Sequence, residues 1–260
     1  EGIPTVPKER RIRPIHIWQS AAAILFLLLA SSVYLSTVGT KAETDLLQQY
    51  IPIAEMRSLT LPDGTKVQLN SKSTLLYPQE FTGDSRSVFL LGEANFKVKP
   101  DKKRPFIVKS NDLQITAIGT EFNVSAYPES QEIATTLISG SIRVDYNNLT
   151  TSVILHPNEQ FAYNRNNKKY DLSNPDMDDV TAWQRGELVL QKMTLTDIIN
   201  VLERKYPYAF VYSIKNLKND RFSFRFKDNA PLEEVMEIIV NVVGQMDYRI
   251  VEDKCYLTRI

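Results

Sequence analysis

The stretch Gly92-Glu-Ala-Asn-Phe-Lys-Val98 places a glycine before polar residues and then before two apolar residues that flank a polar one. Similar stretches occur at Gly64-Thr-Lys-Val-Gln-Leu69, Gly119-Thr-Glu-Phe-Asn-Val124 and Gly140-Ser-Ile-Arg-Val144. Apolar residues at every second position are typical of a strand with one buried face, and glycine permits a tight corner before it. The stretches predict one all-β domain over residues 55–165. Because the glycine spacing drifts, this domain is either a β-solenoid or a β-sandwich of short strands.

A polar, turn-rich linker is expected over residues 166–182, and a different pattern follows it. From residue 183 onward, a strand, a helix and a strand occur twice in succession. Each helix is predicted by apolar residues repeating every three or four positions, beginning at Leu195 and at Leu232. The two stripes match one another, which indicates a duplicated β-α-β unit. The sequence therefore predicts an α+β domain over residues 183–260.

A long uncharged run, residues 17–40, precedes both domains, and its centre, which includes Leu25 and Leu28, is apolar. A helix of about 20 such residues crosses the hydrocarbon layer of a membrane. Trp18 and Tyr34 lie toward the two ends of the run, where aromatic side chains favour the membrane interface. The run thus predicts a single-pass membrane protein.

The distribution of basic residues gives this span an orientation. Lysine and arginine cluster in residues 8–13, whereas few follow the run closely. By the positive-inside rule, residues 1–16 form a cytoplasmic juxtamembrane linker, and residues 41–54 form a linker on the outer side of the membrane. A short helix is expected over residues 43–50. A secretory signal peptide is the alternative, because Ala30-Ser31-Ser32 has the small residues of a cleavage site.

The composition indicates neither an enzyme nor a nucleic-acid-binding protein. The formal net charge is +0, so direct binding to nucleic acid is not expected. His16, His156 and Cys255 are the only imidazoles and the only thiol, and their spacing fits no metal site. The sequence has no phosphate-binding loop and no nucleophile or metalloprotease motif. We therefore expect no cofactor and no catalysis on a separate substrate.

Gly119-Thr120 is the one dipeptide with possible chemistry on the chain itself. A threonine hydroxyl held against the preceding carbonyl can attack it and convert the amide to an ester, which then hydrolyses. The simpler interpretation is a glycine corner followed by a β-branched residue that enters a strand. Both interpretations stay open from the sequence.

The segments of the β region together resemble the FecR-like anti-sigma factors, which regulate cell-surface signalling. The resemblance depends on residues 61–77, beginning Leu61-Pro-Asp-Gly-Thr65, and on residues 91–98, 118–124, 139–144 and 157–162. These segments occur in the family's order and spacing. Residues 183–260 resemble the short domain at the amino end of secretins and TonB-dependent transducers, the STN domain.

The resemblance implies a location and a set of partners. A helical domain upstream of Glu1 would hold an extracytoplasmic-function sigma factor in the cytoplasm. The body would lie in the periplasm of a bacterium, anchored in the inner membrane, and contact the signalling domain of an outer-membrane TonB-dependent transporter for siderophores or, as in the SusC type, for glycans. Envelope proteases would then cut the chain in steps. Some relatives cleave themselves at a Gly-Thr bond near the position of Gly119-Thr120.

The contact with the transporter is expected at the edges of the C-terminal sheets. Unpaired edge strands offer free N–H and C=O groups to which a partner can add a strand. The strands predicted for this role contain Phe222, Phe224 and Phe226 in one case and Tyr256 and Leu257 in the other. Two other functions stay open: a scaffold of the cell envelope related to secretins, and a membrane-tethered glycan-binding module.

Overall fold

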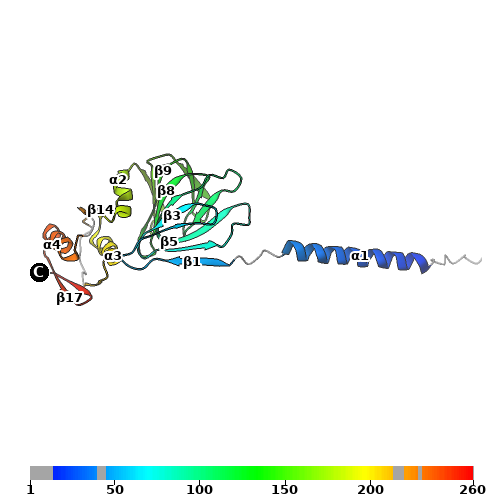
Figure 1. Cartoon of the computed structure of the whole chain (residues 1–260), viewed down its shortest axis with the longest axis horizontal. Helices are drawn as coiled ribbons and strands as arrows, with labels where there is room; N and C mark the ends of the chain where they lie inside the picture. Colours follow the sequence, from blue (N-terminus) through cyan, green and yellow to red (C-terminus); the bar gives the residue numbers. More distant parts are fainter. Residues whose placement is uncertain (1–13, 40–44, 213–219, 228–229, 260) are drawn as a thin grey trace, which may run out of the picture. The chain divides into compact units, whose positions relative to one another are not determined.

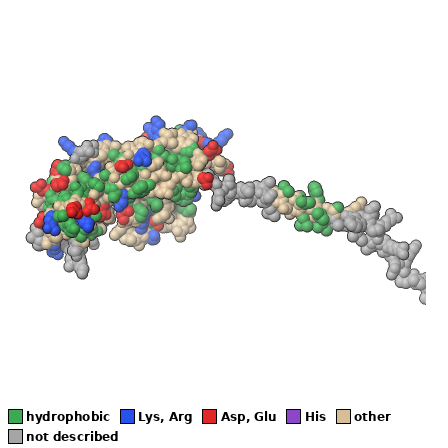
Figure 2. Space-filling model, turned by 60° about the horizontal axis from the view of Figure 1, so that its bottom comes forward, with side chains coloured by type: hydrophobic (Ala, Val, Ile, Leu, Met, Phe, Trp, Pro, Cys, Tyr) green, Lys and Arg blue, Asp and Glu red, His purple; other side chains and the backbone are tan. Residues whose placement is uncertain are grey.

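A computed structural model describes residues 14–39, 45–212, 220–227 and 230–259 of the chain (Figure 1). The chain divides into two compact units, Glu1–Thr44 and Asp45–Ile260, and each is described by itself. The first unit contains the helix α1 (Pro14–Gly39). Figure 2 shows hydrophobic side chains along the described part of α1, and those of residues 24–29 are more than half exposed. Among the described residues, no helix is both long and apolar enough to cross a membrane. The span over residues 17–40 is thus still a prediction.

The second unit begins with a β-sandwich of thirteen strands. Their bounds are β1 (Leu46–Tyr50), β2 (Arg57–Thr60), β3 (Lys66–Leu69), β4 (Thr74–Pro78), β5 (Arg86–Lys97), β6 (Phe106–Lys109), β7 (Gln114–Ala117), β8 (Glu121–Ala126), β9 (Glu132–Ser139), β10 (Ile142–Tyr146), β11 (Thr151–Leu155), β12 (Gln160–Asn164) and β13 (Lys169–Ser173).

Strand β5 belongs to both sheets of the sandwich. Its first part pairs with β4 and β6, and its last part pairs with β3 and β8. One sheet continues through β7, β10 and β11, and the other continues through β9, β12 and β13. Strands β5 and β6 run parallel, whereas the other pairs of the sandwich run antiparallel.

Gly92 lies where β5 passes from one sheet to the other. Its φ is +105°, and a Cβ at this position would lie 2.7 Å from the Cα of Ser73. Both the backbone conformation and the close approach of Ser73 therefore require glycine. Gly64, Gly119 and Gly140 precede strands as the repeated pattern predicts, but Gly92 lies inside a strand.

We expect Gly92→Ala to destabilise the sandwich by about 2–5 kcal/mol, the sum of a strained positive φ and a steric clash with Ser73. The measurement is urea unfolding of the full chain, followed by circular dichroism. Gly83→Ala is the matched control, because a Cβ there meets nothing within 4 Å. Equal unfolding midpoints for the two variants would contradict the prediction.

The two sheets enclose one core. The ring of Phe96 in β5 lies 6.0 Å from that of Phe106 in one sheet and 5.4 Å from that of Phe122 in the other, measured between centroids. Near the other end of the sheets, Tyr146 lies 5.3 Å from Phe161. Because side chains of both sheets meet across a single interior, the all-β domain is a sandwich and not a solenoid.

Two segments expected to be linkers contribute strands instead. Strand β1 replaces the described part of the short helix predicted over residues 43–50, whose first two residues lie outside the described ranges, and β1 pairs with β4 along its whole length. A helix of one or two turns is marginal by itself, whereas the edge of β4 satisfies the backbone of β1 at once. Strand β13, which falls within residues 166–182, pairs with β12 and extends the sandwich beyond residue 165.

The C-terminal lobe follows the sandwich, after the short helices α2 (Met177–Thr181) and η1 (Ala182–Arg185). Its elements are β14 (Leu188–Met193), α3 (Leu195–Lys205), β15 (Ala209–Tyr212), β16 (Phe222–Phe226), α4 (Leu232–Val243), β17 (Met246–Val251) and β18 (Lys254–Arg259).

The order of these elements confirms the duplicated β-α-β unit. The first strands of the two units, β14 and β16, pair with each other antiparallel. In a second sheet, β18 lies between β15 and β17. Thr194 caps α3 by accepting a hydrogen bond from the backbone N–H of Asp197, at 3.2 Å. Cys255 is buried in the lobe's core, and burial raises the pKa of its thiol to about 11, so the thiol stays protonated.

Candidate functional site

Gly119 and Thr120 form the turn between β7 and β8. The Thr120 carbonyl accepts a hydrogen bond from the backbone N–H of Val98 at 2.9 Å, which fixes the turn on the preceding loop. A Cβ on Gly119 would lie 2.9 Å from the Cα of Pro100, so the loop leaves room for glycine alone. Gly140 packs on the other side, against the methyl group of Thr120. The dipeptide is thus held closely from two sides.

The Thr120 hydroxyl is buried and has no hydrogen-bond partner among the described residues. A buried hydroxyl without a partner is uncommon and calls for an explanation. No described side chain is placed to take its proton, so attack on the Gly119 carbonyl would depend on backbone geometry alone. Self-cleavage is therefore still a prediction, and the glycine corner before β8 is what the geometry itself requires.

If the chain cleaves itself, wild-type protein in cells will yield a fragment that begins at Thr120, and Thr120→Ala will stay intact. Mass spectrometry of the purified chains measures both outcomes. The matched control is Thr116→Ala, which removes another buried hydroxyl without a partner and should leave cleavage unchanged. An intact wild-type chain would count against the reaction.

The loop beneath this turn is held by a buried ion pair that the sequence analysis missed. Arg86 Nη1 lies 2.7 Å from Asp63 Oδ2, and the two side chains are only 1% and 4% exposed. Arg86 also donates hydrogen bonds to the carbonyls of Lys99 and Arg104, at 2.9 Å each. No local pattern in the sequence marks Arg86 as the partner of Asp63.

The strands predicted to bind a partner differ in their availability. Strand β16 pairs with β14 on one side, and no described strand pairs with its other side. The rings of Phe224 and Phe226 are buried in the lobe's core, and Phe222 packs against it, so β16 can offer its backbone edge but not these rings. Strand β18 is paired on both sides, so the expectation that Tyr256 and Leu257 lie on an edge strand is wrong. Strand β18 is central because it pairs with β17 and also with β15, which lies far away in the sequence.

The predicted membrane-anchor residues all belong to α1. Leu25, Leu28 and Tyr34 are 61%, 63% and 67% exposed. Trp18 lies within the bounds of α1, but its side chain is outside the described set. Their role in a membrane stays a prediction.

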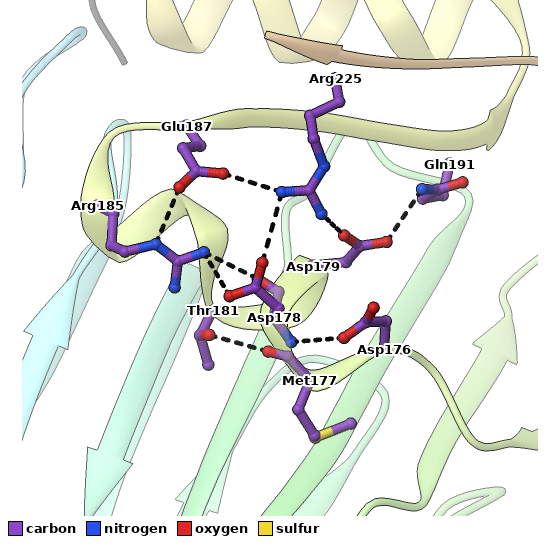
Figure 3. A network of polar contacts seen from close by, with 9 residues as sticks. All are labelled: Asp176, Met177, Asp178, Asp179, Thr181, Arg185, Glu187, Gln191 and Arg225. Carbon is purple, nitrogen blue, oxygen red and sulfur yellow. Dashed lines mark hydrogen bonds and ion pairs between the residues drawn. The ribbon is translucent and has the colours of Figure 1, made fainter. Parts of the chain in front are cut away.

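Arg225 of β16 ties the C-terminal lobe to the segment that leaves the sandwich (Figure 3). Its guanidinium contacts the carboxylate of Asp179, lies 2.9 Å from Glu187 and lies 3.5 Å from Asp178. Arg185 of η1 pairs with Asp178 at 2.8 Å and with Glu187 at 2.9 Å. A single exposed ion pair adds little stability. A network of two arginines and three carboxylates, however, fixes the orientation of β16 relative to α2 and η1.

A second contact joins α3 directly to the sandwich. The guanidinium of Arg204 lies 3.8 Å from the ring centroid of Tyr127, and its Nη1 lies 2.8 Å from Glu129 Oε1. The Arg204 carbonyl accepts a hydrogen bond at 3.0 Å from the backbone N–H of Ala54. Ala54 lies between β1 and β2 in the chain. Helix α3 therefore contacts the segment that leads into the sandwich sheet containing β2 and β3.

A chain of hydrogen bonds crosses the same junction. Trp183 Nε1 donates to Asn123 Oδ1 at 3.3 Å, and Asn123 Nδ2 donates to Glu93 Oε1 at 3.0 Å. Asn70 Nδ2 donates to the other oxygen of Glu93 at 2.8 Å. Burial raises the pKa of Glu93, although both amide hydrogen bonds lower it. The junction between the sandwich and the C-terminal lobe, which sequence patterns did not reveal, is therefore polar and specific.

Within the described ranges, no three or more His, Cys, Asp or Glu side chains are grouped to hold a metal ion. The polar groups described above can bind, orient or bridge the two lobes. Their geometry contains no nucleophile paired with a base.

Comparison with known proteins connects both lobes to one family. The FecR protein family matches residues 51–143, and the FecR C-terminal family matches residues 187–257. The second match covers the lobe that resembles the STN domain, and that finer resemblance is not confirmed. No curated protein matches the chain.

Two crystal structures of a candidate anti-sigma factor from Parabacteroides distasonis ATCC 8503, at 1.65 Å and 2.50 Å resolution, are similar to the chain. Each is 34% identical, with TM-scores of 0.77 and 0.78. The matches cover 82% and 83% of this chain and 99% and 100% of the solved chains. With both lobes matched in order, and with this identity over most of its length, the chain belongs to the FecR protein family.

Proposed function

We propose that the protein is an anti-sigma factor and signal transducer of the bacterial inner membrane. The observation that carries this proposal is the likeness of both lobes, in one order and at 34% identity, to a candidate anti-sigma factor. The partner in the cytoplasm is an extracytoplasmic-function sigma factor.

In this proposal the N-terminal unit anchors the protein, with residues 45–260 in the periplasm. Support comes from the uncharged run of residues 17–40, which continues past the described side chains of α1 at both ends. The basic cluster in residues 8–13 supports a cytoplasmic amino end. Neither observation depends on how α1 is placed relative to the sandwich.

The periplasmic partner is the signalling domain of an outer-membrane TonB-dependent transporter. The unpaired side of β16 supports this choice, because its backbone can accept a strand from a partner. Loading of the transporter changes the contact, and envelope proteases then cut the chain and release the sigma factor. The direct contact between α3 and Ala54 offers a short physical connection from the C-terminal lobe toward the membrane-proximal segment.

The test is deletion of the gene, followed by transcript profiling with and without candidate inducers, and complementation with the wild-type gene. We expect an operon for an outer-membrane transporter to lose its normal response to the inducer and to regain it on complementation. A strain in which no transporter operon changes would overturn the proposal. A defect in the cell envelope without any transcriptional response would instead support the scaffold.

A further inference from the structure

A cavity of about 260 Å³ lies at the junction between the sandwich and the C-terminal lobe. Its polar lining includes Glu93, Asn123, Thr136, Gln160 and Trp183. The volume is close to the lower end of the range for small-molecule sites, about 300–1,000 Å³. A ligand that fits must therefore be small.

One wall of the cavity is part of a row of neutral polar side chains. The row crosses the sandwich sheet that contains β3, β8, β9 and β12. Gln68 of β3 is opposite Asn95 of β5, Asn95 is opposite Asn123 of β8, Asn123 is opposite Thr136 of β9, and Thr136 is opposite Gln160 of β12. Paired residues lie on the same face of a sheet, so these side chains share one face. The last three of them line the cavity.

The row has more hydrogen-bonding capacity than the protein itself uses. Gln160 Nε2 donates to Thr136 Oγ1 at 2.8 Å, and Asn123 bonds Trp183 and Glu93. Each amide has a second N–H and a second lone pair, and each oxygen of Glu93 has a further lone pair. Donors and acceptors therefore alternate along the wall. Such a surface needs a polar occupant.

Most charged groups that line the cavity already have partners, and the buried carboxylate of Glu93 already accepts hydrogen bonds from Asn70 and Asn123, which disfavours an ionic occupant. Arg204 is already paired with Glu129 and Tyr127, and Asp179 and Glu187 are already paired with Arg225. Trp183 also lines the cavity, and its indole N–H already donates to Asn123 of the row. A polar wall next to an indole suits a molecule with hydroxyl groups on its rim and C–H groups on its face.

We propose that this cavity binds a neutral polyhydroxylated molecule of about monosaccharide size. Glu93, Asn123, Thr136 and Gln160 exchange hydrogen bonds with its hydroxyls, and Trp183 packs against its ring. Leu188 of β14 and Val201 of α3 line the cavity as well, so a ligand in it touches both the sandwich and the C-terminal lobe and stabilises their junction. This site is additional to the proposed binding of a sigma factor and does not depend on it.

Tryptophan fluorescence tests the proposal directly, because the sequence contains only Trp18 and Trp183. The full chain with Trp18→Phe is placed in phosphocholine detergent, since maltoside headgroups are themselves sugars. The probes are xylose, glucose, galactose, mannose and N-acetylglucosamine, with acetate and sulfate as charged controls. We expect a saturable change in emission with at least one sugar, with a midpoint of about 1–10 mM, and none with the anions.

Variants locate the site. Gln160→Leu and Thr136→Val should each weaken the binding of that sugar about tenfold, the effect of one lost hydrogen bond. Gln68→Leu is the matched control, because it belongs to the same polar row but lies outside the cavity. Thermal unfolding shows whether each variant is folded. If Gln160→Leu does not fold, Thr136→Val tests the site in its place.

Two results would overturn the proposal. One is the absence of a saturable response to every sugar up to about 100 mM, which would leave water as the occupant. The other is equal sugar binding by Gln160→Leu, Thr136→Val and Gln68→Leu. Neither result affects the transcript test of the anti-sigma function, so the two proposals can fail separately.

Discussion

Replacement of Leu25 and Leu28 by arginine is expected to prevent membrane insertion of the protein. On insertion scales, leucine at the centre of a span contributes about −0.3 to −0.6 kcal/mol and arginine costs about 2.5–3.5 kcal/mol. The double variant Leu25→Arg/Leu28→Arg therefore costs about 6–8 kcal/mol relative to the wild type. Such a cost exceeds what snorkelling from the centre of the run can recover. Membrane flotation, with alkaline phosphatase fused after Thr44, measures the loss of both membrane retention and export.

The control for this variant changes the same helix without adding charge. Ser31→Leu/Ser32→Leu makes the run more apolar and should leave membrane retention and phosphatase activity at wild-type levels. If the arginine variant floats with the membrane as the wild type does, residues 17–40 do not anchor the chain. If a processed chain is found in the soluble periplasmic fraction of the wild type, the signal-peptide alternative holds.

Removal of the Arg86 side chain is expected to destabilise the sandwich by about 3–5 kcal/mol, because it leaves the buried carboxylate of Asp63 without its partner. The cost arises from desolvation and not from the loss of attraction alone. Arg86→Met keeps most of the aliphatic volume, so it creates little cavity. Urea unfolding followed by circular dichroism should show a large fall in the midpoint.

Two further variants separate the charge effect from general damage. Arg57→Met removes one partner of an exposed pair, in which the side chains of Arg57 and Glu55 are 48% and 53% exposed, and should cost less than about 1 kcal/mol. Arg86→Met/Asp63→Leu leaves no buried charge and should recover most of the lost stability. A double variant less stable than Arg86→Met would show that packing around Arg86, and not the unpaired charge, causes the loss.

Most of the local elements of this protein could be predicted from its sequence. The alternation around Val67, Phe96, Phe122 and Val144 predicts strands that the structure confirms, because a strand in a half-buried sheet needs an apolar residue at every second position. The stripe beginning at Leu195 predicts α3 for a similar local reason. The sequence could not decide between a sandwich and a solenoid, since both folds use the same alternation of apolar and polar residues and differ only in which strands pair.

The candidate sites were less predictable than the elements. The sequence predicts a corner at Gly119, because glycine before a strand is a local signal. The close approach of Pro100, which requires glycine at this position, has no such local signal. The edge expected for Tyr256 and Leu257 was wrong, because an interior strand and an edge strand of a small sheet have similar sequences. The sequence of residues 43–50 predicts a helix in place of β1, because these residues do not reveal the edge of β4 that stabilises the strand.

Residues near one another in the chain were enough to predict most strands and helices, the duplication in the C-terminal lobe and the resemblance to the FecR family. Only contacts between distant residues show that β5 serves two sheets, that Arg86 neutralises Asp63 and that Trp183 reaches Asn123. Trp183 and Asn123 are 60 positions apart, and Asn95 and Gln160 share a face only through the pairing of intervening strands. The junction between the sandwich and the C-terminal lobe, and the cavity in it, depend on pairing between residues that are far apart in the chain. The sequence around any one residue does not specify such pairing.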